Sequence, residues 1–440
     1  MVGRTDPRAP SAPFHTPGSG PANTHNDAVY SPACECWRAN SEDRELPRFV
    51  AIPVGQGDAF FLDRGNGESV LVDGGRATSG FAKQFKSEFS RRHVSVVVCT
   101  HNDADHANGV LGFLEDADLS CDEVWLPYTW SQVLAELPQT VIAVLDELVR
   151  NVGEREYQEH WEAVEMRLNE YGDGLSLQLA ERRNDELGED VPLDADLQAE
   201  LALRGEPTSV LGMLVQRAPG FLEHVVHELG AGLHATQVRA ICMAVSAASK
   251  IADIAIAAAA KHIPIKWFKY DVLTQYGGNA YLAPVNARRV NAITASGLSL
   301  FDLLALTTAN RESLVFWSPR TTTFPGVLFT ADSDLSGQTM PAGMHHHSLC
   351  TAPHHGSESN AVAYAVVEGS VARPEALTWV RSQGRISGHP GPTYLGLGGR
   401  RFCTICRLGV MGWTANEPVK FYSRSTHWVR MAPNTKCVCW

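Results

Sequence analysis

Short apolar segments recur in two parts of the chain, with the lengths and flanking turns typical of β-strands. In the first part, Ala51 to Val54 and Ala59 to Leu62 predict a hairpin, and Ser69 to Val72 predicts the returning strand. Val94 to Cys99 is almost wholly apolar, which predicts a strand covered on both faces. The second part adds strand-like segments at Asn310 to Pro319, Val327 to Thr330, Leu349 to Ala352 and Leu377 to Val380, and a helix at Asn360 to Val371.

The spacing of apolar residues becomes helical between these two parts. We therefore predict an α/β domain formed by residues 47–130 and 265–440, interrupted by a helical insertion at 131–264. Helical spacing occurs at Val141 to Arg150, Glu154 to Tyr171, Asp194 to Arg204, Ser209 to Leu229 and Ala235 to Lys261. Because Lys250 and Asp253 interrupt the Ala-rich segment 241–260, we expect a buried helix there and no membrane span.

The two ends of the chain differ from the domain in composition. Residues 1–46 are rich in Pro, Ser and Gly and lack an apolar stretch for a signal peptide or anchor, which predicts a disordered segment of a cytoplasmic protein. The ten cysteines are then expected to be thiols. Cys403, Cys406, Cys437 and Cys439 could together hold a structural zinc, although a hairpin at 401–408 would account for the first two without metal.

The most informative segment lies at the carboxyl end of the strand at Val94 to Cys99. His101, Asp103, Asp105 and His106 fall within six residues, on the loop where open α/β sheets place their ligands. Two imidazoles and two carboxylates at this density are typical of a metal site. By contrast, the run His345 to His347 is expected to be incidental surface histidines that could scavenge metal.

The order of these motifs resembles that of the metallo-β-lactamase fold hydrolases. Their His-x-His-x-Asp-His signature occurs here with Asp103 in place of the second His, as in the hydrolase domain of competence-type DNA uptake proteins (ComEC) and its stand-alone soluble bacterial relatives. Further matching motifs are Val54-Gly55-Gln56-Gly57-Asp58-Ala59, Val70-Leu71-Val72-Asp73-Gly74-Gly75, Val327-Leu328-Phe329-Thr330-Ala331-Asp332, Ala352-Pro353-His354-His355-Gly356-Ser357 and Gly388-His389-Pro390. The resemblance implies an αββα sandwich.

The resemblance also implies roles for individual residues. Asp332 would bridge two metal ions, preceded by Ala331 where the family usually has Gly, and Asp73 would support the metal loop from behind. We expect Asp334 to be a helix cap or solvated. The ligand that many members supply between the first motif and Asp332 is expected to be missing. The expected metal ligands are His101, Asp103, Asp105, His106, Asp332 and His354, and the catalytic residues are Asp105, Asp332 and His355.

Two assignments remain open at this stage. His354 is favoured as the ligand, with His355 as a proton donor, but the sequence also allows the reverse. His389 could bind substrate or fill the vacant metal position, and it could equally be an ordinary loop histidine. The carboxylate at Asp103 hardens the site, so manganese competes with zinc as the expected metal.

The distribution of charge bears on the partners. Residues 146–206 contain 18 Asp and Glu against 6 Arg and no Lys, a net charge of −12 that equals the net charge of the whole chain. No basic stripe is evident, so tight binding of long DNA is not expected.

We therefore expect a metal-dependent hydrolase that uses a metal-held hydroxide, most plausibly a phosphodiesterase or nuclease acting on a nucleotide or short nucleic acid. The alternatives are an esterase or lactonase acting on a small molecule, and a bacterial defence or signalling protein that binds a protein partner through its acidic insertion.

Overall fold

The computed structural model describes residues 46–128, 250–290 except 252, 312–382, 389–405, 417–431 except 425, and 437. Nearly all of the expected N-terminal segment 1–46 and most of the expected helices of the insertion lie outside these residues. The last of those helices is described in part. Residues 250, 251 and 253–260 are helical and bury Ile251, Ile254, Ala255 and Ala258, so this part of the expected buried helix is confirmed. No helix in the described segments is long and apolar enough to span a membrane.

Within the described residues the larger sheet has nine strands, and its central part is parallel. Its order is β15 (His427–Arg430), β14 (Val419–Arg424), β1 (Arg48–Ala51), β2 (Phe60–Asp63), β3 (Ser69–Val72), β4 (His93–Val98), β5 (Ser120–Pro127), β6 (Ile265–Tyr270) and β8 (Ala287–Val290). Strands β1 to β3 form the two antiparallel connections expected from the apolar pattern, whereas β3, β4, β5 and β6 are parallel neighbours. The chain between β5 and β6 therefore leaves this sheet and returns beside the strand that it left.

The smaller sheet contains six strands. Its order is β13 (Arg400–Cys403), β12 (Thr378–Arg381), β11 (Leu349–Thr351), β10 (Val327–Phe329), β9 (Phe316–Ser318) and β7 (Ala283–Pro284). The expected pairing of β9 with β10 is antiparallel, and β10 through β13 are parallel. The hairpin expected at 401–408 lies partly outside the described residues, and its described part, β13, pairs in parallel with β12.

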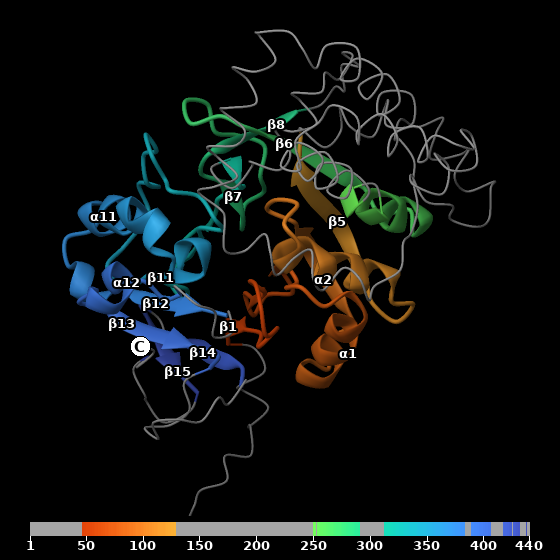
Figure 1. Cartoon of the computed structure of the whole chain (residues 1–440), viewed down its shortest axis with the longest axis horizontal. Coiled ribbons are helices and arrows are strands. Elements are labelled where there is room, and N and C mark those ends of the chain that lie inside the picture. The colour runs from red at the N-terminus through yellow and green to blue at the C-terminus, as the bar shows by residue number, and fades with distance from the viewer. Residues whose placement is uncertain are drawn as a thin grey trace, which may run out of the picture.

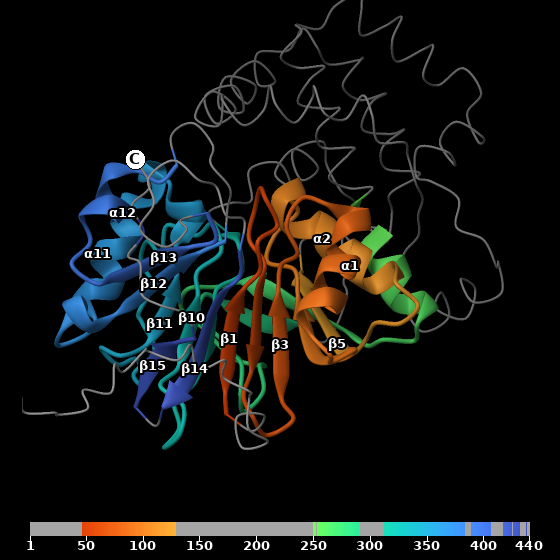
Figure 2. The ribbon, with the colours of Figure 1, turned by 90° about the horizontal axis from the view of Figure 1, so that it is seen from below.

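The two sheets pack face to face, with helices on both outer faces (Figures 1 and 2). Apolar side chains of both sheets, such as Phe49 and Phe60 from one and Phe329 from the other, fill the space between them. Helices α1 (Thr78–Glu88) and α2 (Ala104–Glu115) cover the larger sheet, and α11 (Ala361–Gly369) and α12 (Pro392–Gly396) cover the smaller one. The result is the four-layered α/β sandwich that the resemblance implied.

This topology concentrates polar residues at one edge of the sandwich. Asp73 follows β3 and His101 follows β4, while Asp332 follows β10 and the 3₁₀ turn η3 (Pro353–Gly356) follows β11. Because parallel strands bring their carboxyl ends to the same edge, four segments far apart in the sequence meet there.

Candidate metal centre

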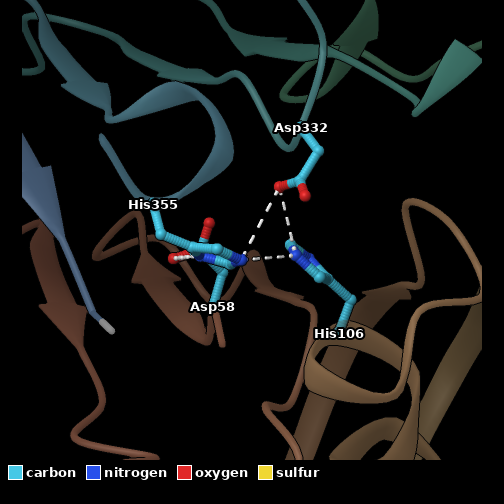
Figure 3. Close-up of side chains that lie close together, drawn as sticks. All are labelled: Asp58, His106, Asp332 and His355. Carbon is cyan, nitrogen blue, oxygen red and sulfur yellow. Dashed lines mark hydrogen bonds and ion pairs between the residues drawn. The ribbon is translucent and has the colours of Figure 1, made fainter. Parts of the chain in front are cut away.

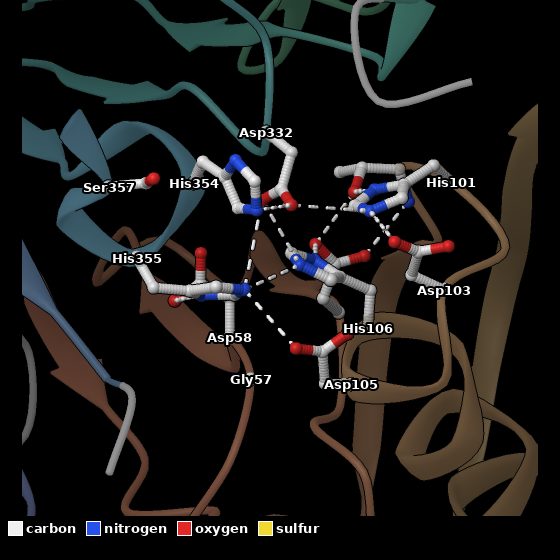
Figure 4. A network of polar contacts seen from close by, with 12 residues as sticks. Gly57, Asp58, His101, Asp103, Asp105, His106, Asp332, His354, His355 and Ser357 are labelled. Carbon is white, nitrogen blue, oxygen red and sulfur yellow. Dashed lines mark hydrogen bonds and ion pairs between the residues drawn. The ribbon is translucent and has the colours of Figure 1, made fainter. Parts of the chain in front are cut away.

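Asp332 lies at the middle of a buried cluster of imidazoles (Figures 3 and 4). Its carboxylate is 2% exposed. One oxygen, Oδ1, lies 3.1 Å from His106 Nε2 and 3.9 Å from His355 Nε2. The other oxygen, Oδ2, lies 3.6 Å from His101 Nε2 and 3.5 Å from His354 Nε2. Each oxygen of one carboxylate therefore faces its own pair of imidazole nitrogens.

All four imidazoles turn the same ring nitrogen toward Asp332, because a neighbour occupies the other one. The partners of the Nδ1 atoms are Thr100 Oγ1 for His101 at 3.0 Å, Asp73 Oδ2 for His106 at 2.8 Å, Asn360 Oδ1 for His354 at 3.0 Å and Asp58 Oδ1 for His355 at 3.2 Å. The last contact has ion-pair distance without hydrogen-bond alignment. An Nδ1–H that is donated to an oxygen leaves the lone pair on Nε2, which is the form that binds metal.

Asp73 supports the first histidine pair from behind, as the resemblance implies. Its Oδ1 accepts the amide of Thr100 at 2.8 Å, and its Oδ2 accepts the Thr100 hydroxyl at 2.8 Å as well as His106 Nδ1. Since the hydroxyl proton of Thr100 goes to Asp73, the Thr100 oxygen is left to accept the proton of His101 Nδ1. One buried carboxylate thus orients two imidazoles.

Three further carboxylates surround the cluster. Asp103 Oδ2 lies 3.8 Å from His101 Nε2, and Asp105 Oδ2 lies 3.4 Å from His355 Nε2. In the part of the chain that the structure describes, two groups of donor atoms are compact enough for an ion: one of Asp58, His106, Asp332 and His355, and one of His101, Asp103 and Asp332. We assign Asp58 an orienting role within the first group, because its Oδ1 lies against Nδ1 of His355 while Asp105 approaches Nε2.

The donor atoms fit divalent ions. His106 Nε2 and His355 Nε2 are 3.2 Å apart. Two nitrogens bound to one tetrahedral zinc at about 2.0–2.1 Å would be separated by roughly the same distance. His101 Nε2 and Asp332 Oδ1 are buried without a hydrogen-bond partner. A cation in each of the two groups of donor atoms would satisfy them, since buried polar atoms without partners are costly.

The electrostatics agree with that fit. Burial lowers the pKa of His106, but the carboxylates of Asp332 and Asp73 outweigh it and hold the pKa well above the usual value. Burial likewise lowers the pKa of His355, while Asp58 and Asp332 raise it to about 10. Protons held this tightly show a surplus of buried negative charge, and a bound cation would displace them.

An unusual backbone turn brings two consecutive histidines into the cluster. His354 and His355 both adopt left-handed conformations, with φ of 45° and 54°. Such conformations cost roughly 1–2 kcal/mol per residue, and the surrounding contacts must offset this. The amide of His354 donates to the carbonyl of Ala331 at 3.0 Å, and buried Arg381 donates to the carbonyl of His355 at 3.1 Å. Ala331 also has a positive φ of 46°, which explains why glycine suits that position.

The structure therefore brings together seven residues expected at the site, namely His101, Asp103, Asp105, His106, Asp332, His354 and His355. Both His354 and His355 point at Asp332, so neither is excluded as a ligand. The ring centroid of His389 lies 5.6 Å from that of His354. Burial, followed by the charges of His355 and His354, lowers the pKa of His389 to about 3. Its role stays a prediction.

Other expected positions lie away from the centre. Cys403 and Cys437 are buried, whereas Cys406 and Cys439 fall outside the described residues, so the structural zinc stays a prediction. Asp334 accepts the amide of Ser336 at 2.9 Å within a turn, and no helix begins there, so it is not the helix cap that the sequence offered as one of two readings.

Sequence reasoning quoted Asp58 within a motif without giving it a role, and it missed Thr100 and Asn360. The available sequence signal for Asp58 was its place beside Gly57, directly ahead of β2. Asn360 had none, because its contacts with His354 and with the carbonyl of Asp332 depend on the tertiary fold.

Comparison with known proteins agrees with this geometry. A comparison with protein-family models matches residues 52–120 to the metallo-beta-lactamase superfamily. Those residues contain Asp58, Asp73 and the segment from His101 to His106. Among curated proteins, no match to the chain is found. The matched segment, the α/β sandwich and the buried His/Asp cluster together indicate a metal-dependent hydrolase with a metallo-β-lactamase fold.

Proposed function

We propose that the protein is a phosphodiesterase or nuclease that acts on a nucleotide or short nucleic acid with two divalent ions. The observation that carries the proposal is the position of Asp332, whose two oxygens face two separate pairs of imidazole nitrogens. A carboxylate shared in this way is typical of two-ion sites, which are common in phosphatases and nucleases.

The surrounding side chains divide into two sets of ligands. Asp105, His106 and His355 would hold one ion together with Asp332 Oδ1. His101, Asp103 and His354 would hold the other with Asp332 Oδ2. In this proposal His354 takes the place of the ligand that is expected to be missing between the first motif and Asp332. Zinc or manganese suits a set that mixes imidazoles with carboxylates.

The bound ions would activate water and neutralise charge that develops on a phosphoryl group. The protein supplies orientation and access. Asp103 and His354 have side chains 30% and 18% exposed, whereas His106 is fully buried, so substrate approaches from the side of the second set. His389 stays neutral at physiological pH, since its pKa is depressed to about 3, and its ring can donate one hydrogen bond to a substrate oxygen.

The substrate class is tested with purified protein loaded with manganese or zinc. We expect turnover of a bis-aryl phosphodiester, of single-stranded DNA or of a cyclic dinucleotide, with aryl esters hydrolysed far more slowly. Faster turnover of aryl esters would favour the esterase or lactonase alternative. A protein that binds two ions and turns over none of these substrates would contradict the proposed phosphodiesterase and favour the interaction role of the insertion.

The two sets of ligands make a separate prediction about His354. His354→Ala should lower the bound metal from about two ions per chain to about one, because the set around His106 and His355 is untouched. Elemental analysis after gel filtration measures this. The matched control is His389→Ala, a neighbouring imidazole that should leave both ions bound. Loss of an ion from the His389 variant alone would instead place His389 in the vacant metal position.

A further inference from the structure

A second group of histidines lies at the opposite edge of the smaller sheet. His345, His346 and His347 lie just before the start of β11, whereas the metal centre lies just after the end of that strand. The rings of His345 and His346 are 3.7 Å apart between centroids, those of His346 and His347 are 4.3 Å apart, and His347 lies 6.2 Å from His427. Together with Arg320 and Arg373 we call these residues the edge cluster.

Hydrogen bonds fix the tautomers of two of these imidazoles. The backbone amide of His347 donates to His345 Nδ1 at 3.3 Å. A guanidinium nitrogen of Arg373 contacts His346 Nε2. Backbone amides and guanidinium groups only donate, so each of these ring nitrogens must be the acceptor. When neutral, His345 therefore carries its proton on Nε2, and His346 carries its proton on Nδ1.

These tautomers favour an anion over a metal ion. A metal needs a ring nitrogen with a lone pair, and on both residues that nitrogen already accepts a hydrogen bond. The remaining nitrogens are N–H donors. Positive charge is also in excess: burial and then the charges of His346, Arg320 and Arg373 lower the pKa of His345. Burial and then the charge of Arg373 also lower the pKa of His346, against the opposing effect of Glu375.

We propose that the edge cluster binds a phosphoryl oxyanion, either inorganic phosphate or the terminal phosphate of a nucleotide. Arg320 and Arg373 supply the charge, and the N–H groups at His345 Nε2 and His346 Nδ1 supply additional donors. Guanidinium groups recognise phosphate oxygens through paired N–H donors, and charge-assisted bonds of this kind are about twice as strong as neutral ones. This site is separate from the metal centre, and it does not depend on the reaction catalysed there.

Calorimetric titration of the full metal-loaded chain tests the proposal, with inorganic phosphate in one series and adenosine monophosphate in another. Arg373→Gln should weaken binding by about tenfold or more, as expected for the loss of a charge-assisted hydrogen bond. His345→Gln, which keeps a donor group, should weaken it less. The matched control is Arg289→Gln on β8, which removes an arginine from the larger sheet and should leave the affinity unchanged. Whichever of inorganic phosphate and adenosine monophosphate binds more tightly identifies the source of the phosphate.

Three results would overturn the proposal. The first is equal affinity in the wild type and in the Arg373 variant, because phosphate would then bind only at the metal centre. The second is saturation only at concentrations far above those of cellular phosphate, which is adventitious binding. The third is the loss of one zinc equivalent in a variant combining His345→Gln and His346→Gln, which would show that the histidines ligate metal. Circular dichroism of each variant establishes that the fold is kept.

Discussion

Asp332→Asn should lower hydrolysis of the proposed phosphodiester substrate by about two orders of magnitude or more while the fold is retained, because it removes the carboxylate that we propose two ions share. The side chain faces four Nε2 atoms and is 2% exposed. An amide offers one carbonyl oxygen, and its NH₂ group is a donor that cannot bind a cation. One of the two pairs of imidazoles would then lose its shared ligand.

Two measurements on the same protein separate this role from a structural one. Elemental analysis should show a lower metal content than in the wild type, and circular dichroism of the metal-free variant should show that the fold is kept. Asp334→Asn is the control, because it removes a carboxylate two residues away that caps a turn and should leave both metal and turnover nearly intact. Wild-type turnover in Asp332→Asn would show that the shared carboxylate is not required for the reaction.

Strands next to the metal centre were predictable from the sequence, because they are short apolar runs with polar ends. Val94 to Cys99 corresponds to β4 (His93–Val98), and Val327 to Thr330 corresponds to β10 (Val327–Phe329). The C-terminal strands β14 and β15 were not anticipated. The alternation from Val419 to Ser423 was a signal for β14, but its pairing with β1 joins the two ends of the domain and is set by tertiary packing.

The residue types of the site were predictable for a related reason. Metal ligands at a strand end stand out in a sequence because packing does not account for them. The choice between His354 and His355 could not be made, because two adjacent residues usually point in different directions. Here two consecutive left-handed residues turn both rings toward Asp332, and the contacts that hold this turn come from Ala331 and Arg381. Those contacts are remote in sequence or depend on β12, so no local pattern reveals them.

A second large effect is expected at the contact between the loop after β3 and helix α2. Gly109 of α2 and Gly74 after β3 approach so closely that a Cβ on Gly109 would lie 1.8 Å from the carbonyl oxygen of Gly74. The amide of Gly74 also donates to the carbonyl of His106 at 2.9 Å, and the amide of Gly109 donates to the carbonyl of Gly75 at 2.9 Å. The two glycines therefore set the distance between Asp73 and the imidazole of His106 that it orients.

Gly109→Ala should therefore reduce the free energy of unfolding by about 3 kcal/mol or more. The new Cβ would clash with the backbone of Gly74, which cannot move aside cheaply. Its metal affinity should fall as well, because α2 carries Asp105 and His106. Gly80→Ala in α1 is the matched control: the nearest atom to its new Cβ lies at 3.7 Å, and the change should stabilise the helix by about 0.5–1 kcal/mol. Urea denaturation of the metal-free proteins measures both effects, and chelator competition measures the metal affinity. If Gly109→Ala were as stable as Gly80→Ala, the close approach of α2 to the loop after β3 would not exist in solution, and Asp73 could not orient His106 in the way described.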